Sequence, residues 1–363
     1  MPLPTRVDVH TASRQYTVLI GQGLLAQLSR VLDESGLGSR RVVVSNPTVW
    51  GHWGSVLRQS WPAKEPVLVP DGEQYKTLHT VTRVYEALFQ ARADRETAIV
   101  TFGGGVVGDL AGFAAASYLR GLGLAHVPTT LLAQVDAAVG GKVGVNLPGG
   151  KNLVGAFYQP WVVVSDQDVL QTLPRREFRA GLYEIVKYGV ACSRDLFERL
   201  HRDLGPVTKR EAGALAPVIA ESCRIKAAIV VTDEREAGAR RVLNFGHTAG
   251  HALEAVTRYR RFLHGEAVAC GMLVACEIAR GRGLLSGQDH GRLESLLGQL
   301  GPLPTLADLR ASDIVDAMRA DKKSREGRLT FVLPVAIGQT TIVDDVEDEE
   351  IARALVACGL SSL

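Results

Sequence analysis

The chain has 363 residues, of which 46% are hydrophobic and 22% are charged, and its formal net charge is +2. This is the composition of an ordinary soluble protein with a sizeable core, and the length predicts two domains or one large one. A net charge so near zero argues against nucleic acid or a membrane surface as partner. An anionic substrate would therefore need a local cluster of lysines and arginines.

The expected compartment is the cytoplasm. The first ten residues contain no apolar run typical of a secretory signal, and no stretch of 18 apolar residues could span a membrane. The five cysteines are sparse and form no C-x-x-C pair, which is typical of reduced thiols in a reducing compartment.

The first 170 residues alternate strand and helix patterns. Residues 5–20 alternate apolar and polar side chains, which predicts a strand or hairpin. Helical patterns such as residues 78–92 separate short β-branched segments bounded by turn residues. These segments predict strands at 42–45, 67–69, 98–102, 124–127 and 162–165. Such alternation predicts an α/β domain with a Rossmann-like parallel sheet and crossover helices.

After about residue 170 the periodicity becomes helical almost throughout. Helices are predicted at 176–201, 210–232, 247–259, 265–282 and 288–300. Residues 330–335 and 339–344 predict a late hairpin, followed by an amphipathic closing helix. We therefore predict an α/β domain of residues 1–172 and a mostly α-helical domain of residues 173–363.

A glycine-rich segment follows the predicted strand 98–102. It reads Gly103-Gly104-Gly105-Val106-Val107-Gly108-Asp109 and runs into a helical pattern at 110–119. Glycine lets the backbone approach an anion, and the N–H groups that open a helix favour negative charge. An ordinary Rossmann site also has an acid about 20 residues later, and none occurs at 124–130. The segment predicts a phosphate-binding loop on an α/β sheet; a tight strand-to-helix turn is the alternative.

Three further segments could each bind a ligand or could be an ordinary turn, helix cap or loop. Asp71 and Glu73 follow the predicted strand 67–69 and could accept from a ribose, although Asp-Gly is also a common turn. Thr129 and Thr130 follow another strand, where a helix N-cap is equally consistent. Residues 136–152 hold five glycines, Lys142 and Lys151, which suits phosphate or carboxylate binding or an exposed flexible loop.

Histidines and a glutamate suggest a metal centre in the second half. His247 and His251 are four residues apart and would share one helix face, and His264 follows. Glu184 lies in an otherwise apolar helical pattern, three residues before Lys187. The spacing predicts an open zinc site of three histidines with Glu184 as a further candidate. Hydrogen-bonded or surface histidines are the alternative, and the segment lacks the H-E-x-x-H pattern of metalloproteases.

Together these segments resemble the 3-dehydroquinate synthase family of sugar-phosphate cyclases. The matching stretches occur in the family's order at 71–76, 103–109, 127–146, 149–157, 181–189, 233–251 and 264–272. The resemblance implies that residues 1–172 bind NAD and that residues 173–363 bind metal and substrate. It also changes the metal set to Glu184, His247 and His264, with His251 facing the substrate instead.

The resemblance implies further site residues. Positions matching the family's NAD contacts are Asp71, Gly72, Glu73, Gln74, Tyr75, Lys76, Gly105, Val106, Val107, Gly108, Asp109, Thr129, Thr130, Lys142, Lys151, Val169, Leu170, Gln171 and Thr172. Positions matching its substrate contacts are Asp136, Lys142, Asn152, Lys187, Lys226, Arg240, Asn244, His251 and one of Lys322 and Lys323. Arg120 matches an arginine that the family's homodimer lends across its interface.

The implied reaction converts 3-deoxy-D-arabino-heptulosonate 7-phosphate to 3-dehydroquinate and phosphate, in the shikimate pathway. NAD oxidises an alcohol, phosphate leaves by β-elimination, the hydride returns, and the ring opens and closes by an aldol step. The implied cofactors are NAD and a divalent zinc or cobalt ion. Three alternatives are another sugar-phosphate cyclase with an inosose or valiolone product, a metal-dependent polyol dehydrogenase, and a nucleotide-binding scaffold.

Overall fold

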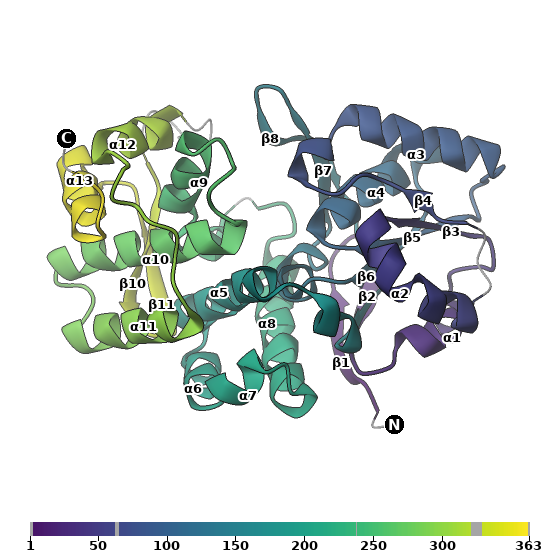
Figure 1. The fold of residues 1–363 in the computed structure, drawn as a ribbon, viewed down its shortest axis with the longest axis horizontal. Coiled ribbons are helices and arrows are strands. Elements are labelled where there is room, and N and C mark those ends of the chain that lie inside the picture. Colours follow the sequence, from purple (N-terminus) through teal and green to yellow (C-terminus); the bar gives the residue numbers. More distant parts are fainter. Residues whose placement is uncertain (1–2, 62–64, 237, 321–328, 362–363) are drawn as a thin grey trace. The chain divides into compact units, whose positions relative to one another are not determined.

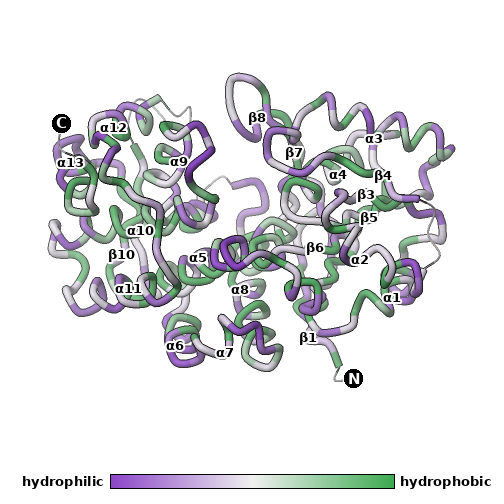
Figure 2. Tube along the Cα trace, viewed as in Figure 1, coloured by the Kyte–Doolittle hydropathy of each residue, from purple (hydrophilic) through white to green (hydrophobic). Residues whose placement is uncertain are grey.

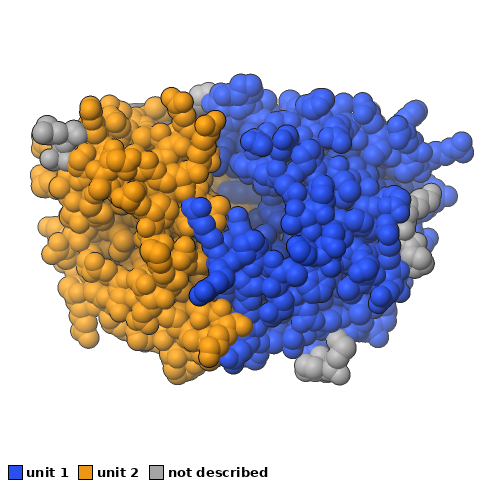
Figure 3. All heavy atoms as spheres, viewed as in Figure 1, with its two compact units in different colours: residues 1–178, 210–235 blue, residues 179–209, 236–363 orange. Residues whose placement is uncertain are grey.

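The chain forms two compact units in the computed structural model, which describes residues 3–61, 65–236, 238–320 and 329–361. Unit 1 comprises Met1–Phe178 and Arg210–Arg235, and unit 2 comprises Arg179–Lys209 and Glu236–Leu363 (Figure 3). Helix α8 (Ala212–Thr232) thus belongs to unit 1, although it follows unit 2 segments in sequence. The division between residues 172 and 173 stays a prediction, because compact units alone do not define a domain.

Unit 1 is built on a seven-stranded sheet in the order β1-β2-β9-β6-β5-β3-β4 (Figure 1). Its strands are β1 (Thr5–His10), β2 (Gln15–Gly21), β3 (Arg41–Ser45), β4 (Val67–Leu68), β5 (Ala98–Gly103), β6 (Gly123–Pro128) and β9 (Val162–Asp166). The β1–β2 pair is antiparallel, and all other neighbours are parallel. The predicted parallel sheet is therefore confirmed.

Helices pack against this sheet because its central strands are apolar on both faces (Figure 2). Those of unit 1 are α1 (Leu28–Glu34), α2 (Pro47–Ser60), α3 (Leu78–Gln90), α4 (Gly105–Ser117) and α8. One core cluster joins α3 and α4 to the strands, with Val84, Ile99 and Leu110 fully buried. This packing holds the start of α4 at the end of β5.

The glycine-rich segment at 136–152 is ordered as part of a hairpin. Strands β7 (Lys142–Leu147) and β8 (Gly150–Phe157) pair antiparallel, with Gly144 opposite Gly155. A Cβ on Gly144 would lie 2.6 Å from Val154 O, and one on Gly155 would lie 2.3 Å from Val143 O. The hairpin replaces the flexible loop that was one sequence alternative, and these glycines allow close strand approach.

Unit 2 is mostly helical, as predicted, with one hairpin. Its helices are α5 (Arg175–Cys192), which starts in unit 1, α6 (Arg194–Arg202), α7 (Leu204–Thr208), α9 (His247–Val256), α10 (His264–Gly281), α11 (Gly287–Leu300), α12 (Ala311–Ala320) and α13 (Asp348–Ala357). Strands β10 (Phe331–Ala336) and β11 (Gln339–Val343) form the predicted late hairpin. The predicted single helix at 176–201 is wrong: it breaks at Ser193, whose side chain accepts from Leu196 N and caps α6.

Helix α10 is the centre of unit 2, since it contacts α9, α11, α13 and β10. All five cysteines are free thiols, and Cys270 and Cys276 on this helix are buried. Within the described residues, every helix is too short or too polar to cross a bilayer.

Candidate active site

The glycine-rich turn places the N-terminus of α4 at the carboxyl end of β5. The turn is tight: a Cβ on Gly103 would meet Val107 Cγ2 at 2.6 Å, and one on Gly104 would meet Thr130 Cγ2 at 3.0 Å. Among the residues that the structure describes, no side chain caps the first turn of α4. Main-chain N–H groups at an uncapped helix start can bind an anion, and the missing side chains let a phosphate approach. The predicted phosphate-binding loop thus has suitable geometry.

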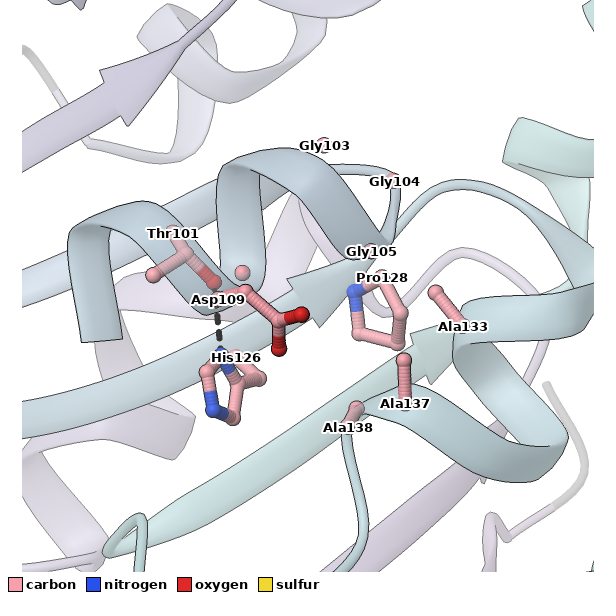
Figure 4. Close-up of a pocket in the computed structure, with 11 residues that line it drawn as sticks. Thr101, Gly103, Gly104, Gly105, Asp109, His126, Pro128, Ala133, Ala137 and Ala138 are labelled. Atoms are coloured by element: carbon pink, nitrogen blue, oxygen red, sulfur yellow. Dashed lines mark hydrogen bonds between the residues drawn. The ribbon is translucent and has the colours of Figure 1, made fainter. Parts of the chain in front are cut away.

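Asp109 of α4 and His126 of β6 line a small cavity beside this turn (Figure 4). His126 Nδ1 and Thr101 Oγ1 share a hydrogen bond of 2.8 Å. Burial lowers the pKa of His126 to about 4, so the ring is neutral. Burial also raises the pKa of Asp109, against the opposing effect of the Lys76 ammonium.

A hydrogen-bond network joins three of the predicted binding segments. Lys76 Nζ donates to Asp109 Oδ2 at 2.5 Å and to Asn152 Oδ1 at 2.6 Å. Asn146 accepts from Asn152 N at 2.8 Å and donates to Glu73 Oε1 at 2.8 Å. Asn146 was missing from the predicted site, although it ends one of the matching stretches. Its uncharged side chain carried no signal of its own.

Other predicted cofactor residues have structural partners. Asp71 Oδ2 accepts from Thr48 Oγ1 at 2.9 Å, and Thr172 Oγ1 accepts from Trp53 Nε1 at 2.8 Å. Thr130 Oγ1 accepts from Ala133 N at 3.1 Å, as an N-cap does. The Thr129 hydroxyl is buried and has no hydrogen-bond partner in the described part of the chain.

Asp136 and Lys226 form a partly buried ion pair in unit 1. Asp136 lies on a π-helical turn at Ala133–Ala137, a conformation frequent at functional sites. Lys226 Nζ contacts the Asp136 carboxylate and donates to its main-chain oxygen at 2.6 Å. The pair brings together two predicted substrate residues that are 90 positions apart.

Three imidazoles meet in unit 2. His247 and His251 lie one turn apart on α9, and His264 begins α10. One ring nitrogen from each lies within 4.8 Å of the others. His247 Nδ1 is 3.2 Å from Phe245 O, so its Nε2 is the atom suited to bind a metal. The three histidines that the sequence spacing grouped together therefore do lie close to one another in the structure.

Glu184 of α5 lies beside this cluster with its carboxylate fully buried. Its Oε2 is 2.5 Å from Lys187 Nζ, and its Oε1 is 3.8 Å from His264 Nε2. Oε2 is thus paired with the Lys187 ammonium, whereas Oε1 has no hydrogen-bond partner among the described residues. A buried carboxylate oxygen without a hydrogen-bond partner, next to an imidazole nitrogen, fits a divalent cation.

Close helix packing at glycines assembles the cluster. A Cβ on Gly271 of α10 would lie 1.9 Å from Gly246 O, and one on Gly250 of α9 would lie 2.9 Å from Ala267 O. A Cβ on Gly265 would lie 2.0 Å from Ala180 O of α5. These contacts hold α5, α9 and α10 close enough for their histidines and Glu184 to meet. The sequence contains these glycines, but their partners are visible only in the structure.

The remaining predicted residues are placed as follows. Arg240 is buried on the 3-10 turn Ala239–Asn244, which ends at Asn244. Arg120 has a left-handed φ of 68°. Lys322 and Lys323 lie outside the described residues.

Solved structures similar to this chain include sugar-phosphate cyclases. A 2-epi-5-epi-valiolone synthase from Streptomyces hygroscopicus, with NAD⁺ and Zn²⁺ bound, is 28% identical, has a TM-score of 0.87 and covers 98% of this chain and 99% of its own. A 2-deoxy-scyllo-inosose synthase complexed with carbaglucose-6-phosphate, NAD⁺ and Co²⁺ is 30% identical, with a TM-score of 0.85, and the match covers 97% and 99%. A protein from Sinorhizobium meliloti 1021 described as a probable glycerol dehydrogenase, at 16% identity and a TM-score of 0.66, shares the fold. Fold and site thus define a protein of the sugar-phosphate cyclase type.

Sequence comparison narrows this class. The N-terminal family model of 3-dehydroquinate synthase matches residues 66–180, and the C-terminal model matches residues 181–324. The 3-dehydroquinate synthase of Pelotomaculum thermopropionicum is 47% identical, over 93% of this chain and 92% of the relative. That of Gloeobacter violaceus is 45% identical, over 96% and 98%. The chain belongs to the 3-dehydroquinate synthase family.

Proposed function

We propose that this protein is a 3-dehydroquinate synthase, a lyase that turns 3-deoxy-D-arabino-heptulosonate 7-phosphate into 3-dehydroquinate and phosphate in the shikimate pathway. The observation that carries the assignment is the buried Glu184 carboxylate facing His264 within a cluster of imidazoles. The same chain has an open helix N-terminus suited to a dinucleotide phosphate. Curated relatives at 42–47% identity favour this reaction over those of the inosose and valiolone synthases at 28–30%.

NAD and a divalent zinc or cobalt ion are the cofactors. We assign the ion to Glu184, His247 and His264, which supply one carboxylate and two imidazoles and leave a position for substrate. When bound, NAD would take and return a hydride while the ion polarises the substrate alcohol. His251 would then face the substrate instead of the ion.

We assign the dinucleotide to unit 1. Its phosphates would lie on the N–H groups at Gly105–Asp109, and the network around Lys76 would orient the neighbouring segments. Lys76 neutralises the partly buried Asp109 and holds Asn152 in its left-handed conformation, with φ 54°. Thr129 offers a buried hydroxyl without a partner in the described residues, which suits a ligand oxygen.

Cationic side chains would grip the two anionic ends of the substrate. Lys142, Lys226 and Arg240 are our candidates, together with one of Lys322 and Lys323. Lys226 is pre-oriented by its contacts to Asp136, so it loses little conformational entropy when it binds an anion. We assign to His251 and Asn244 the contacts to the reacting hydroxyls and the relay of protons.

We further propose a cytoplasmic homodimer that shares Arg120 across its interface. The exposed apolar side chains of Leu153 and Phe157 on β8 support an interface at this strand, since exposed apolar surface often marks a contact site. The five free thiols suit a reducing compartment. Sedimentation gives the assembly state, and Arg120→Ala should lose activity while it still binds NAD. A monomeric active enzyme would contradict this assembly.

One experiment tests the function. The protein is incubated with the heptulosonate phosphate, catalytic NAD⁺ and Zn²⁺, and phosphate is measured while the carbocycle is identified by NMR. We expect stoichiometric phosphate and 3-dehydroquinate without net NADH. Accumulation of NADH would indicate a polyol dehydrogenase, and turnover of only a different sugar phosphate would indicate another cyclase.

A further inference from the structure

Glu254 is a buried acid that none of the assigned roles uses. It lies on α9, three residues after His251, and is 4% exposed. Its Oε2 is 3.2 Å from Nδ1 of His264, the first residue of α10. His264 therefore has a carboxylate on each side of its ring, because Glu184 Oε1 lies 3.8 Å from Nε2.

The two distances indicate different roles for the two carboxylates. A separation of 3.2 Å allows a hydrogen bond in which Nδ1–H donates to Glu254. The 3.8 Å between Nε2 and Glu184 is too long for one. Two ligands of one tetrahedral zinc ion, each about 2.1 Å from it, lie about 3.4 Å apart. Nε2 and Glu184 are thus close to the spacing of two atoms that share a cation.

We propose that Glu254 is the positioning residue for the metal ligand His264. It accepts the Nδ1 proton, which holds the ring in the tautomer whose Nε2 lone pair points to Glu184, and its charge makes that nitrogen a better donor to the metal. The inference rests on the metal site of the proposed function. The corresponding nitrogen of His247, Nδ1, is 3.2 Å from a neutral acceptor, the main-chain oxygen of Phe245.

A purely structural role for Glu254 makes a different prediction. In that case its removal would lower stability, but the folded protein would bind metal as before. The two roles are separated by measuring metal affinity and metal geometry in folded variants.

The test uses Glu254→Leu, Glu254→Gln and the matched control Glu277→Gln. Glu277 Oε1 is 3.1 Å from Nε2 of His290, so it forms a similar pair within unit 2. Metal-free protein is titrated with Zn²⁺ and with Co²⁺ against a chromophoric chelator, and the Co²⁺ absorption spectrum is recorded. Thermal unfolding of the metal-free form shows that each variant is folded.

We expect Glu254→Leu to bind Zn²⁺ about 10- to 100-fold more weakly and to change the Co²⁺ spectrum. Glu254→Gln keeps an acceptor without the charge, so it should recover part of the affinity and a near wild-type spectrum. Glu277→Gln should match the wild type. If Glu254→Leu does not fold, the Zn²⁺ affinity of Glu254→Gln distinguishes the positioning role from the purely structural one.

Wild-type affinity and spectrum in folded Glu254→Leu, or an equal loss in Glu277→Gln, would overturn the inference. The proposed function is checked separately with His264→Ala. If His264→Ala loses the metal and Glu254 variants keep it, only the inference fails. If the wild type binds neither ion, both fail.

Discussion

Replacing Gly265 by alanine should disrupt the metal centre without touching a ligand. The added Cβ would lie 2.0 Å from Ala180 O, whereas real Cβ contacts essentially never fall below 3.0 Å. The obstacle is main chain, so no side chain can rotate away. Helix α5 must therefore move from α10 by at least 1.0 Å.

This shift separates Glu184 from His264. Glu184 lies one turn after Ala180 on α5, and His264 precedes Gly265 on α10. Metal–ligand distances tolerate only about 0.2 Å, so a shift of this size should remove the carboxylate ligand and weaken Zn²⁺ binding about 100-fold. Overpacking should also lower the free energy of unfolding by about 1 to 3 kcal/mol.

Zinc titration of the metal-free protein and urea unfolding measure both effects. Gly291→Ala on α11 is the control, because among the described residues nothing outside its own stretch of helix lies within 4 Å of the added Cβ. It should gain about 0.5 to 1 kcal/mol of stability and keep its zinc affinity. Unchanged affinity and stability in Gly265→Ala would refute the argument that main-chain contact at this glycine assembles the site.

Three further predictions concern other parts of the chain. Glu184→Gln should reduce zinc affinity at least about 100-fold and abolish phosphate release. Inductively coupled plasma mass spectrometry measures the bound zinc, and a phosphate assay measures the reaction. Normal zinc content in this variant would contradict the ligand assignment. His126 is neutral when buried, with a folded pKa near 4 against 6.5, so stability should fall with pH below 6.5 and level off below 4. The total is about 3 kcal/mol, and urea unfolding of His126→Gln between pH 7 and pH 5 should lack this slope. Gly144→Ala would place its Cβ 2.6 Å from Val154 O, so it should cost about 1 to 3 kcal/mol and raise KM for NAD⁺, with unchanged kinetics and unfolding as the refuting result.

Features that depend on local sequence were predictable. Short β-branched runs between turn residues predicted the strands of the parallel sheet, because the tendency to form a strand depends on a few neighbouring side chains. The spacing of His247 and His251 placed both rings on one helix face, and the structure confirms their cluster with His264. The break at Ser193 was missed, since an N-cap serine within an apolar periodic run resembles any other polar position.

Contacts between distant segments were decided only by the tertiary structure. Asn146 joins two predicted binding segments, and Glu254 hydrogen-bonds to His264. No sequence pattern around Asn146 or Glu254 predicts which residue each one contacts. Glycines such as Gly265 mark close approach in the sequence, but the backbone they approach belongs to another helix. Periodicity along one segment reports which face is buried, and packing between segments determines what that face meets.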